Sequence, residues 1–155
     1  VSMVVDTIVC IDGCEIIGAF LAEELTRAGV YSRNAHQTIY IITPEYSSAG
    51  QMLFRDNYLS MIKGKNILLL LASATTGKTV TKAVQTLTYY GASISGISAV
   101  FSAANSVMGI PVNSLFSTAD IPDYKTYSSE SCSLCKDNKP IDAFANAFGY
   151  SKINS

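Results

Sequence analysis

The stretch "KNILLLLASATTGKTVTKAVQTLTYYG", residues 65–91, decides how the fold is interpreted. Residues 65–72 are predicted to form a strand, and the continuous apolar run at 67–72 is typical of a strand buried on both faces of a parallel sheet. Residues 78–91 have a helical pattern that ends at Gly91, a common helix stop. The apolar residues at helical spacing are Val80, Ala83, Val84 and Leu87. The stretch therefore predicts a buried strand, a threonine-rich loop and a helix.

A second unit of the same kind comes earlier in the chain. Residues 3–12 are apolar and β-branched, and residues 13–29 change to helical spacing with Gly29 as the stop. The predicted buried face of this helix consists of Ile17, Leu21, Leu25 and Ala28. Further strands are predicted at 37–43, 93–103 and 111–117, a candidate short strand at 52–57, a loop at 44–51 and a short helix at 140–150.

Repeated strand–loop–helix units predict a doubly wound α/β fold: a parallel twisted sheet of about five strands, with right-handed crossovers and helices on both faces. Ligands of such sheets bind beyond the carboxyl ends of the strands. Two loops satisfy that condition, residues 12–15 and residues 72–79. We therefore expect the functional site to include both loops.

The composition limits the classes of function. The chain has 155 residues, of which 48% are hydrophobic and 15% charged, with a formal net charge of −1. This charge does not favour a nucleic-acid partner. No apolar run reaches the roughly 18 residues of a membrane span, and no secretory signal pattern is visible. We expect a cytoplasmic protein with one domain over residues 1–155, in which 118–155 form an irregular extension.

The loop between strand and helix has the chemistry of an anion site. Backbone N–H groups converge at a glycine-rich turn, and the helix dipole adds partial positive charge. Hydroxyl groups of threonine and the ammonium of a lysine add further donors. The predicted phosphate-binding residues are Ser73, Ala74, Thr75, Thr76, Gly77, Lys78 and Thr79.

The same loop partly matches the P-loop pattern G-x-x-x-x-G-K-[ST]. Ala72 stands where the first glycine belongs. A P-loop NTPase also needs a second strand that ends in a carboxylate for magnesium. Residues 93–103 end without one, and Asp120 lies beyond the end of the strand at 111–117. The P-loop NTPase is therefore the less favoured alternative.

Residues 63–102 resemble the type I phosphoribosyltransferase family, especially its orotate and purine members. The shared pattern is an apolar strand, a Thr/Gly loop, a helix ending in "GA" and another apolar strand. "DTIVCIDGCEIIGAFLAEEL", residues 6–25, resembles the family's first strand, pyrophosphate-facing loop and next helix. "SCSLCKDNKPI", residues 131–141, resembles a C-terminal Cys-x-x-Cys segment of some orotate-type members.

The resemblance implies roles for particular residues. Thr75, Thr76, Gly77, Lys78 and Thr79 would hold the 5-phosphate of phosphoribosyl pyrophosphate or of a nucleoside monophosphate. Asp12, Gly13, Cys14 and Glu15 would form the pyrophosphate loop. Mg²⁺ would be the cofactor of an active enzyme, and a homodimer would be the assembly.

The chain departs from the family pattern in three places. The family's acidic pair would fall on Leu71 and Ala72, or on Leu70 and Leu71, so neither register supplies a carboxylate. The family's basic mobile loop would fall within residues 44–60, where only Arg55 is basic. An N-terminal hood segment is not found in the sequence given. Two functions therefore remain open: a phosphoribosyltransferase with weak or lost transfer activity, and a non-catalytic module that senses nucleotide or phosphate.

The cysteines allow several interpretations. Cys132 and Cys135 supply half of a four-ligand zinc site, a redox pair, or an inert reduced pair, and we expect no zinc. Cys14 with His36, the only histidine of the chain, is formally a nucleophile–base pair. A chain of this size needs no disulfides, so we expect all four cysteines to be reduced.

Overall fold

The structure is a computed structural model that describes residues 4–27, 34–35, 37–128, 130–146 and 149–153. It divides into two compact units, Val1–Pro122 and Asp123–Ser155. The boundary lies close to residue 118, where the sequence predicts the start of an irregular extension. That both units belong to one domain stays a prediction.

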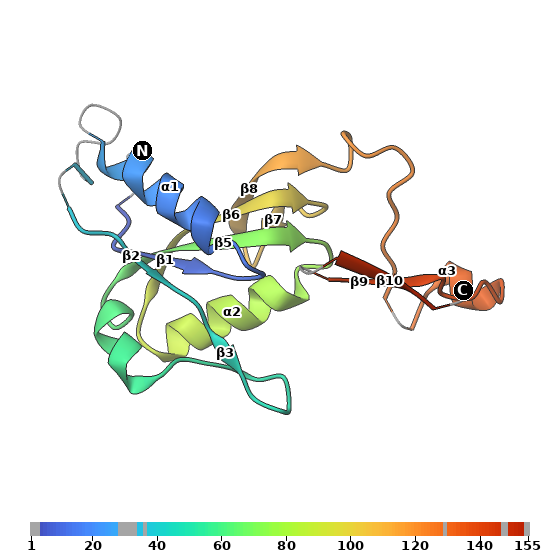
Figure 1. Cartoon of the computed structure of the whole chain (residues 1–155), viewed down its shortest axis with the longest axis horizontal. Coiled ribbons are helices and arrows are strands. Elements are labelled where there is room, and N and C mark those ends of the chain that lie inside the picture. The colour runs from blue at the N-terminus through green and yellow to red at the C-terminus, as the bar shows by residue number, and fades with distance from the viewer. Residues whose placement is uncertain (1–3, 28–33, 36, 129, 147–148, 154–155) are drawn as a thin grey trace. The chain divides into compact units, whose positions relative to one another are not determined.

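Among the described residues, six strands of the first unit form a sheet in the order β2-β1-β5-β6-β8-β7 (Figure 1). All neighbouring pairs are parallel except β7 and β8. The strands are β1 (Thr7–Cys10), β2 (Tyr40–Ile42), β5 (Asn66–Ala74), β6 (Ser93–Ser102), β7 (Ser106–Val107) and β8 (Ile110–Ser117). The predicted sheet of about five parallel strands is confirmed.

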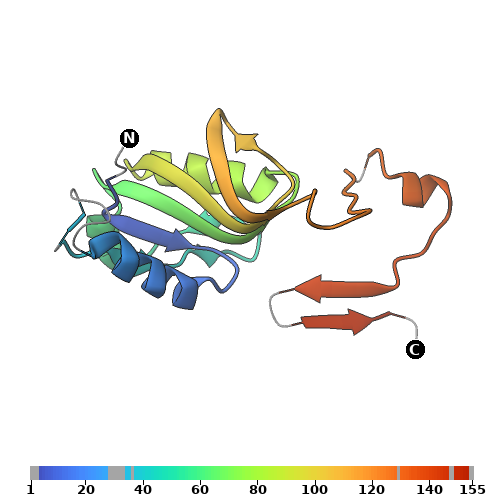
Figure 2. The ribbon, with the colours of Figure 1, turned by 90° about the horizontal axis from the view of Figure 1, so that it is seen from above.

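Two helices cover opposite faces of this sheet, as Figure 2 shows. α1 (Glu15–Thr26) follows β1 and leads to β2, whereas α2 (Lys78–Tyr89) follows β5 and leads to β6. The two crossovers run in opposite directions along the sheet. Because both must be right-handed, they place their helices on opposite faces. The doubly wound arrangement predicted from the sequence is therefore confirmed.

The core has two layers, one on each side of the sheet. Alternate residues of a strand point to opposite faces. Ile8, Cys10, Leu68 and Leu70 accordingly pack with Ala22 and Leu25 of α1. On the other face the larger cluster includes Val9, Leu69, Leu71, Ile97, Val80, Ala83, Val84 and Leu87. The predicted buried face of α2 is therefore correct.

The predicted buried face of α1 is partly wrong. Gly18, Ala22 and Leu25 are buried, whereas Ile17 is 46% exposed. The reason is the close approach of α1 to the sheet at Gly18. A Cβ atom at this glycine would lie 2.6 Å from Cys10 Sγ and 3.6 Å from Leu70 Cδ2. The predicted positions Ala28 and Gly29 lie outside the described residues.

Several short elements differ from the sequence predictions. The predicted loop 44–51 contains β3 (Glu45–Tyr46), which pairs antiparallel with β4 (Met52–Leu53). A 3₁₀ helix, η1 (Asp56–Met61), follows. β7 was not predicted; it pairs with β8 through a two-residue turn in which Met108 and Gly109 both have positive φ. Positive φ at both turn positions matches the tight hairpin connection preferred between twisted strands.

The second unit is mostly irregular. It contains a short helix, α3 (Ser133–Lys136), and an antiparallel hairpin of β9 (Ala143–Asn146) and β10 (Gly149–Lys152). The predicted helix at 140–150 is therefore wrong. Apolar residues at helical spacing, such as Ile141 just before β9 and Phe144 within it, are mostly exposed, so burial does not impose a helix on them.

No helix in the described part of the chain is long and apolar enough to cross a membrane.

The approach at Gly18 gives a test of the packing. Gly18→Ala should lower the free energy of unfolding by about 1–3 kcal/mol, because the new methyl group overlaps Cys10 Sγ. With Cys10→Ala in the same chain the overlap disappears, and the helix preference for Ala over Gly should make Gly18→Ala neutral or stabilising. Urea unfolding of the four proteins in this double-mutant cycle measures the coupling. An equal loss in both backgrounds would contradict the packing described.

Candidate functional site

The loops after β1 and β5 meet at one point of the sheet. β1 and β5 are adjacent, while their crossovers lead outward to β2 and β6. This is the position where doubly wound sheets bind ligands. Cys10 pairs with Leu70, and the Ile11 amide donates to the Leu70 carbonyl at 2.8 Å. Because β5 continues to Ala74, the residues after Ile11 lie beside its end.

A cavity of about 120 Å³ lies at this point. Its lining residues are Asp12, Ser73, Ala74, Thr75, Thr76, Gly77, Lys78, Thr79 and Val80. The structure thus brings Asp12 and all seven predicted phosphate-loop residues, which lie far apart in sequence, around one space. Pockets for whole small molecules are typically about 300–1,000 Å³. The size therefore suits one phosphate group, with the rest of a ligand outside.

The loop is fixed at both ends by backbone hydrogen bonds. The Ala103 amide donates to the Ala74 carbonyl at 2.8 Å, which holds the end of β5 against the end of β6. The Thr81 amide donates to the Gly77 carbonyl at 2.8 Å, so Gly77 caps α2. Gly77 has φ +75°, and a Cβ atom there would lie 3.0 Å from Val107 Cγ2. Both the turn and the close contact with β7 require glycine at this position.

Hydrogen-bond donors of the loop are available to a ligand. Within the described residues, the amides of Thr75, Thr76 and Gly77 donate to no protein acceptor. Lys78 and Thr79 are exposed in the first turn of α2, where helix N–H groups also lack partners. The α2 dipole adds partial positive charge at this end. The arrangement can therefore bind an anion.

Asp12 is the carboxylate of this cavity. Asp12 and Gly13 have φ values of +60° and +78°, and positive φ at a residue other than glycine is often found at functional sites. Burial raises the pKa of Asp12 above its ordinary value. The charge of Asp12 in turn contributes to the raised pKa values of Cys14 and Tyr46, after the larger effect of burial.

The other residues of the predicted pyrophosphate loop do not line the cavity. Gly13 and Glu15 are exposed, and Cys14 is 2% exposed at the N-cap of α1. Glu15 lies close enough to Cys14 to contribute to its raised pKa. The participation of Gly13, Cys14 and Glu15 in ligand binding stays a prediction.

The positions of the family's acidic pair belong to the core. Leu71 is completely buried in the cluster under α2, and Leu70 is 3% exposed in the cluster under α1. Ala72 is half-buried. None of the three lines the cavity. The apolar residues that complete both layers of the core therefore occupy the positions at which the resemblance would place carboxylates.

Arg55, the basic residue predicted within the family's mobile loop, forms an ion pair with Glu45. Arg55 Nε and Nη2 lie 2.7 and 2.6 Å from the two carboxylate oxygens of Glu45. This pair joins the two ends of the β3–β4 hairpin and lowers the pKa of Glu45, chiefly through the hydrogen bond from Arg55. Arg55 is thus engaged within its own hairpin.

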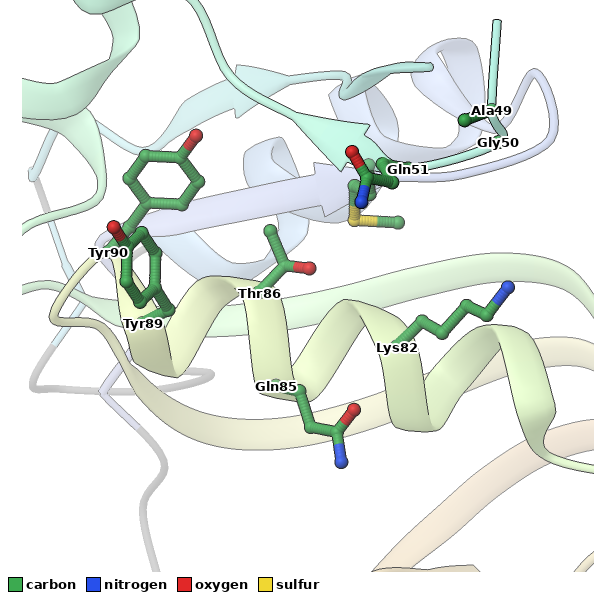
Figure 3. Close-up of a pocket in the computed structure, with 9 residues that line it drawn as sticks. Ala49, Gly50, Gln51, Lys82, Gln85, Thr86, Tyr89 and Tyr90 are labelled. Carbon is green, nitrogen blue, oxygen red and sulfur yellow. The ribbon is translucent and has the colours of Figure 1, made fainter. Parts of the chain in front are cut away.

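A larger cavity of about 470 Å³ lies between this hairpin and α2 (Figure 3). The hairpin contributes Gln51, α2 contributes Lys82, Gln85, Thr86 and Tyr89, and Tyr90 follows at the C-cap of α2. In the figure, the tyrosines and Lys82 lie at opposite ends. This cavity is not predicted from the sequence, because the pattern of residues 44–51 indicates a loop and not the hairpin that forms one wall. The spacing of Lys82, Thr86 and Tyr89 places their side chains on one face of α2, which is compatible with a binding surface. The same spacing is also typical of a helix face that contacts only solvent. We place the candidate site at the smaller cavity because the strand ends and the loop donors converge there.

The two cysteines near the site, Cys10 and Cys14, have raised pKa values, which disfavours the reactive thiolate form. Cys10 is 1% exposed, and burial raises its pKa to about 12, with further contributions from Cys14 and Glu15. A thiol with so high a pKa is a poor nucleophile at neutral pH. His36 lies outside the described residues, so the Cys14–His36 pair is not tested.

Comparisons with known proteins identify the fold. No protein-family model matches the chain, and no curated protein matches its sequence. Among solved structures, adenine phosphoribosyltransferase from Leishmania donovani has a TM-score of 0.54 and 18% identity, and the match covers 89% of this chain and 69% of that chain. Adenine phosphoribosyltransferase from Thermoanaerobacter pseudethanolicus has a TM-score of 0.53 and 13% identity, covering 74% of this chain and 71% of that chain.

Orotate phosphoribosyltransferase from Mycobacterium tuberculosis, in complex with Fe(III) dicitrate, has a TM-score of 0.50 and 13% identity, covering 77% of this chain and 66% of that chain. The chain therefore has a phosphoribosyltransferase-like fold, as the sequence predicts. At these identities the likeness concerns the fold alone.

The two glycines with positive φ at the site make a matched test of the loop. Gly77→Ala and Gly13→Ala each force a side chain into the left-handed region, at a cost of about 1–2 kcal/mol. Gly77→Ala should be the more destabilising of the two, because only its Cβ meets another residue, Val107. Val107→Ala should narrow the difference. Urea unfolding midpoints measure this difference in stability. Equal losses of stability for Gly77→Ala and Gly13→Ala would contradict the close contact between the loop and β7.

Proposed function

We propose that this chain binds a phosphorylated ribose compound, either phosphoribosyl pyrophosphate or a nucleoside 5′-monophosphate, with the 5′-phosphate in the loop 75–79. We further propose that it transfers phosphoribose weakly or not at all. The observation that carries the proposal is the small cavity at the β1–β5 switch point, lined by the loop 73–79. The fold shared with phosphoribosyltransferases supports this class of ligand.

A phosphate in this cavity would meet three kinds of donor. The amides of residues 75–77 and the first turn of α2 would donate to its oxygens, as at other helix N-termini that bind anions. The hydroxyls of Thr75, Thr76 and Thr79 would add side-chain donors, and Lys78 would add a positive charge. Hydrogen bonds to a charged group contribute about 1.5–3 kcal/mol each, so a few of these contacts suffice for useful affinity.

Mg²⁺ would accompany a pyrophosphate ligand. This ion binds proteins through one or two carboxylates and takes its remaining ligands from water and substrate phosphates. Asp12 supplies one carboxylate at the cavity, so the residues present fit such an ion. The ion would supply charge neutralisation for the pyrophosphate leaving group.

Transfer is proposed to be weak because no carboxylate stands at the positions where the resemblance would place the acidic pair. Phosphoribosyl transfer develops positive charge on the ribose ring, which nearby carboxylates stabilise. Leu71 is fully buried, and Ala72 has no polar side chain. Ribose hydroxyls without carboxylate partners lose about 1–3 kcal/mol for each hydrogen bond left unmade. Two lost contacts correspond to several powers of ten in rate.

The alternative is a module that senses nucleotide or phosphate and has no catalytic role. It would use the same loop and the same fold. The two proposals differ in turnover, and they share the binding step. A P-loop NTPase has less support: within the described residues, no carboxylate after β6 or β8 lines the loop cavity.

Ligand binding can be assigned to one of the two cavities with matched variants. Titration calorimetry with phosphoribosyl pyrophosphate, adenosine and orotidine 5′-monophosphates and inorganic phosphate, each with Mg²⁺, measures affinity. Lys78→Ala with Thr79→Val should weaken binding about 10- to 100-fold, since two contacts to phosphate are removed. Lys82→Ala with Thr86→Val, which changes the larger cavity instead, should leave affinity unchanged. The reverse result would move the site to the larger cavity.

Turnover separates a weak enzyme from an ordinary one. We expect consumption of orotate, adenine or hypoxanthine with phosphoribosyl pyrophosphate and Mg²⁺ to be several powers of ten below the usual range of about 1–1,000 per second. Ala72→Asp restores one carboxylate at a half-buried position and should raise the rate if the missing acidic pair is the cause. A wild-type rate within the usual range would contradict the proposal of a weakened site.

We also expect a homodimer, as in orotate-type members of the resembled family. The outer face of α1 carries Ile16 and Phe20, which are 74% and 67% exposed, and large apolar groups of this kind favour association. Light scattering at micromolar concentration should give twice the chain mass. Ile16→Lys with Phe20→Lys should give a monomer, whereas Asp56→Lys, with the same change in charge at an exposed position outside α1, should not. A monomeric wild-type chain would contradict this prediction.

A further inference from the structure

The second unit holds two cysteines in one helical turn. Cys132 immediately precedes α3 (Ser133–Lys136), and Cys135 lies within it. The Lys136 amide donates to the Cys132 carbonyl at 3.2 Å, and the Asp137 amide donates to the Ser133 carbonyl at 2.9 Å. Residues three apart in such a turn lie on the same side, with Cβ atoms about 5–6 Å apart. The two thiols are close enough to share a hydrogen bond. A disulfide needs Cβ atoms about 3.5–4.5 Å apart, so the turn has to tighten by about 1–2 Å to join the two sulfurs.

The two thiols are accessible to reagents in solution, in contrast to the cysteines of the first unit. Cys135 is exposed and Cys132 partly exposed, whereas Cys10 and Cys14 are buried. All four are free thiols in the structure. A thiol must be accessible to attack a disulfide in another molecule. Only the pair in the second unit meets this condition among the four.

The surroundings make the two thiols chemically unequal. The backbone amide of Cys135 is the main cause of a lowered pKa at Cys132, and its thiol and the Leu134 amide add to the effect. Hydrogen bonding to Cys132 raises the pKa of Cys135, together with the charge of Cys132. Cys132 is therefore the better nucleophile at neutral pH, and Cys135 keeps its proton until a later step.

Among the described residues, no further metal-binding side chain joins Cys132 and Cys135 to make a larger cluster. In the part of the chain that the structure describes, no group of three or more His, Cys, Asp or Glu residues is arranged to hold a metal ion. Cys-x-x-Cys is a recurring arrangement of redox-active thiols. The chemistry to be tested first is therefore that of a dithiol.

We propose that Cys132 and Cys135 form a redox centre that is converted reversibly into an intramolecular disulfide by exchange with a low-molecular-weight disulfide of the glutathione type. This function is separate from phosphate binding, and it uses residues of the second unit alone. It assigns a chemical role to a motif that the proposed function of the first unit leaves unused.

The exchange has two balanced steps. Cys132 Sγ, as thiolate, attacks one sulfur of the disulfide, forms a mixed disulfide and releases one thiolate of the reagent. Cys135 then loses its proton to water, and its sulfur attacks Cys132 Sγ and releases the second thiolate. The protein loses two electrons, and the reagent disulfide is reduced to two thiols. The reverse sequence reduces the protein again.

The test uses the whole chain in buffers with a series of glutathione to glutathione disulfide ratios at pH 7. Samples are quenched with acid, alkylated and analysed by peptide mass spectrometry. The wild type should gain one disulfide between Cys132 and Cys135, and excess reduced glutathione should remove it. Cys10 and Cys14 serve as internal references, and they should stay reduced and unpaired.

Two single variants test the order of attack. Cys135→Ser should accumulate a mixed disulfide with glutathione at Cys132, because the resolving thiol is gone. Cys132→Ser should form a mixed disulfide at Cys135 more slowly than Cys135→Ser forms one at Cys132, because the amide hydrogen bonds that lower the pKa of Cys132 have no counterpart at Cys135. Both substitutions lie in an exposed turn, and circular dichroism checks that the fold is kept.

Three results would overturn the proposal. The first is that the pair stays reduced even in glutathione disulfide alone. The second is that Cys135 reacts as fast as Cys132. The third is stoichiometric zinc, found by elemental analysis of chain purified without added metal, which would make the thiols metal ligands.

Discussion

The parallel pairing of β1 with β5 is the constraint on which the rest of the structure depends. These strands begin the two crossover units, whose helices leave in opposite directions. Right-handed crossovers then force α1 and α2 onto opposite faces. At the amino end, Asp6 Oδ2 accepts hydrogen bonds from the Asn66 amide and side chain at 2.8 and 2.9 Å. At the carboxyl end, Ile11 bonds to Leu70, and the loops beyond form the cavity.

The position of β5 at the centre of the sheet explains both its apolar sequence and the unusual chemistry beside it. A central strand in a doubly wound fold is covered on both faces, so successive residues all require apolar side chains. Leu70 and Leu71 meet this requirement for opposite layers. A carboxylate at Leu71 would be placed in the core under α2, where an unpaired charge is strongly destabilising. The packing gained at the end of β5 is therefore incompatible with an acidic residue at that position, which links core stability to the proposed loss of transfer.

The sequence predicted the elements whose pattern is decided by burial and missed those decided by local turns. The strand at 65–72, the helix from 78 and the loop between them were predicted because continuous apolar runs and helical spacing reflect two covered faces. Glycine at position 77 indicated the turn. The α1 face was misassigned because Gly18 lets the helix approach Cys10, a contact that no spacing rule contains. The hairpins β3–β4 and β9–β10 have few buried residues. Their sequences therefore show no strong alternation of apolar and polar residues from which strands could be predicted. Asp12 was predicted at the site together with the rest of its loop. Only Asp12 of that loop lines the cavity, because β5 extends beyond the end of β1, and the length of this extension could not be predicted from the sequence.

Asp12 and the phosphate loop face the same small cavity, so the ionisation state of Asp12 depends on the charge of whatever binds in the loop. Burial already raises the pKa of Asp12, because removal of water disfavours the charged carboxylate. A phosphate bound among Thr75, Thr76 and Lys78 would add negative charge nearby and raise that pKa further. Anion binding at this site therefore favours uptake of a proton by Asp12, or of a cation beside it. A divalent cation has the opposite effect, since it stabilises both the carboxylate and the phosphate. The charge arrangement thus favours a phosphate that arrives with a cation over a bare anion.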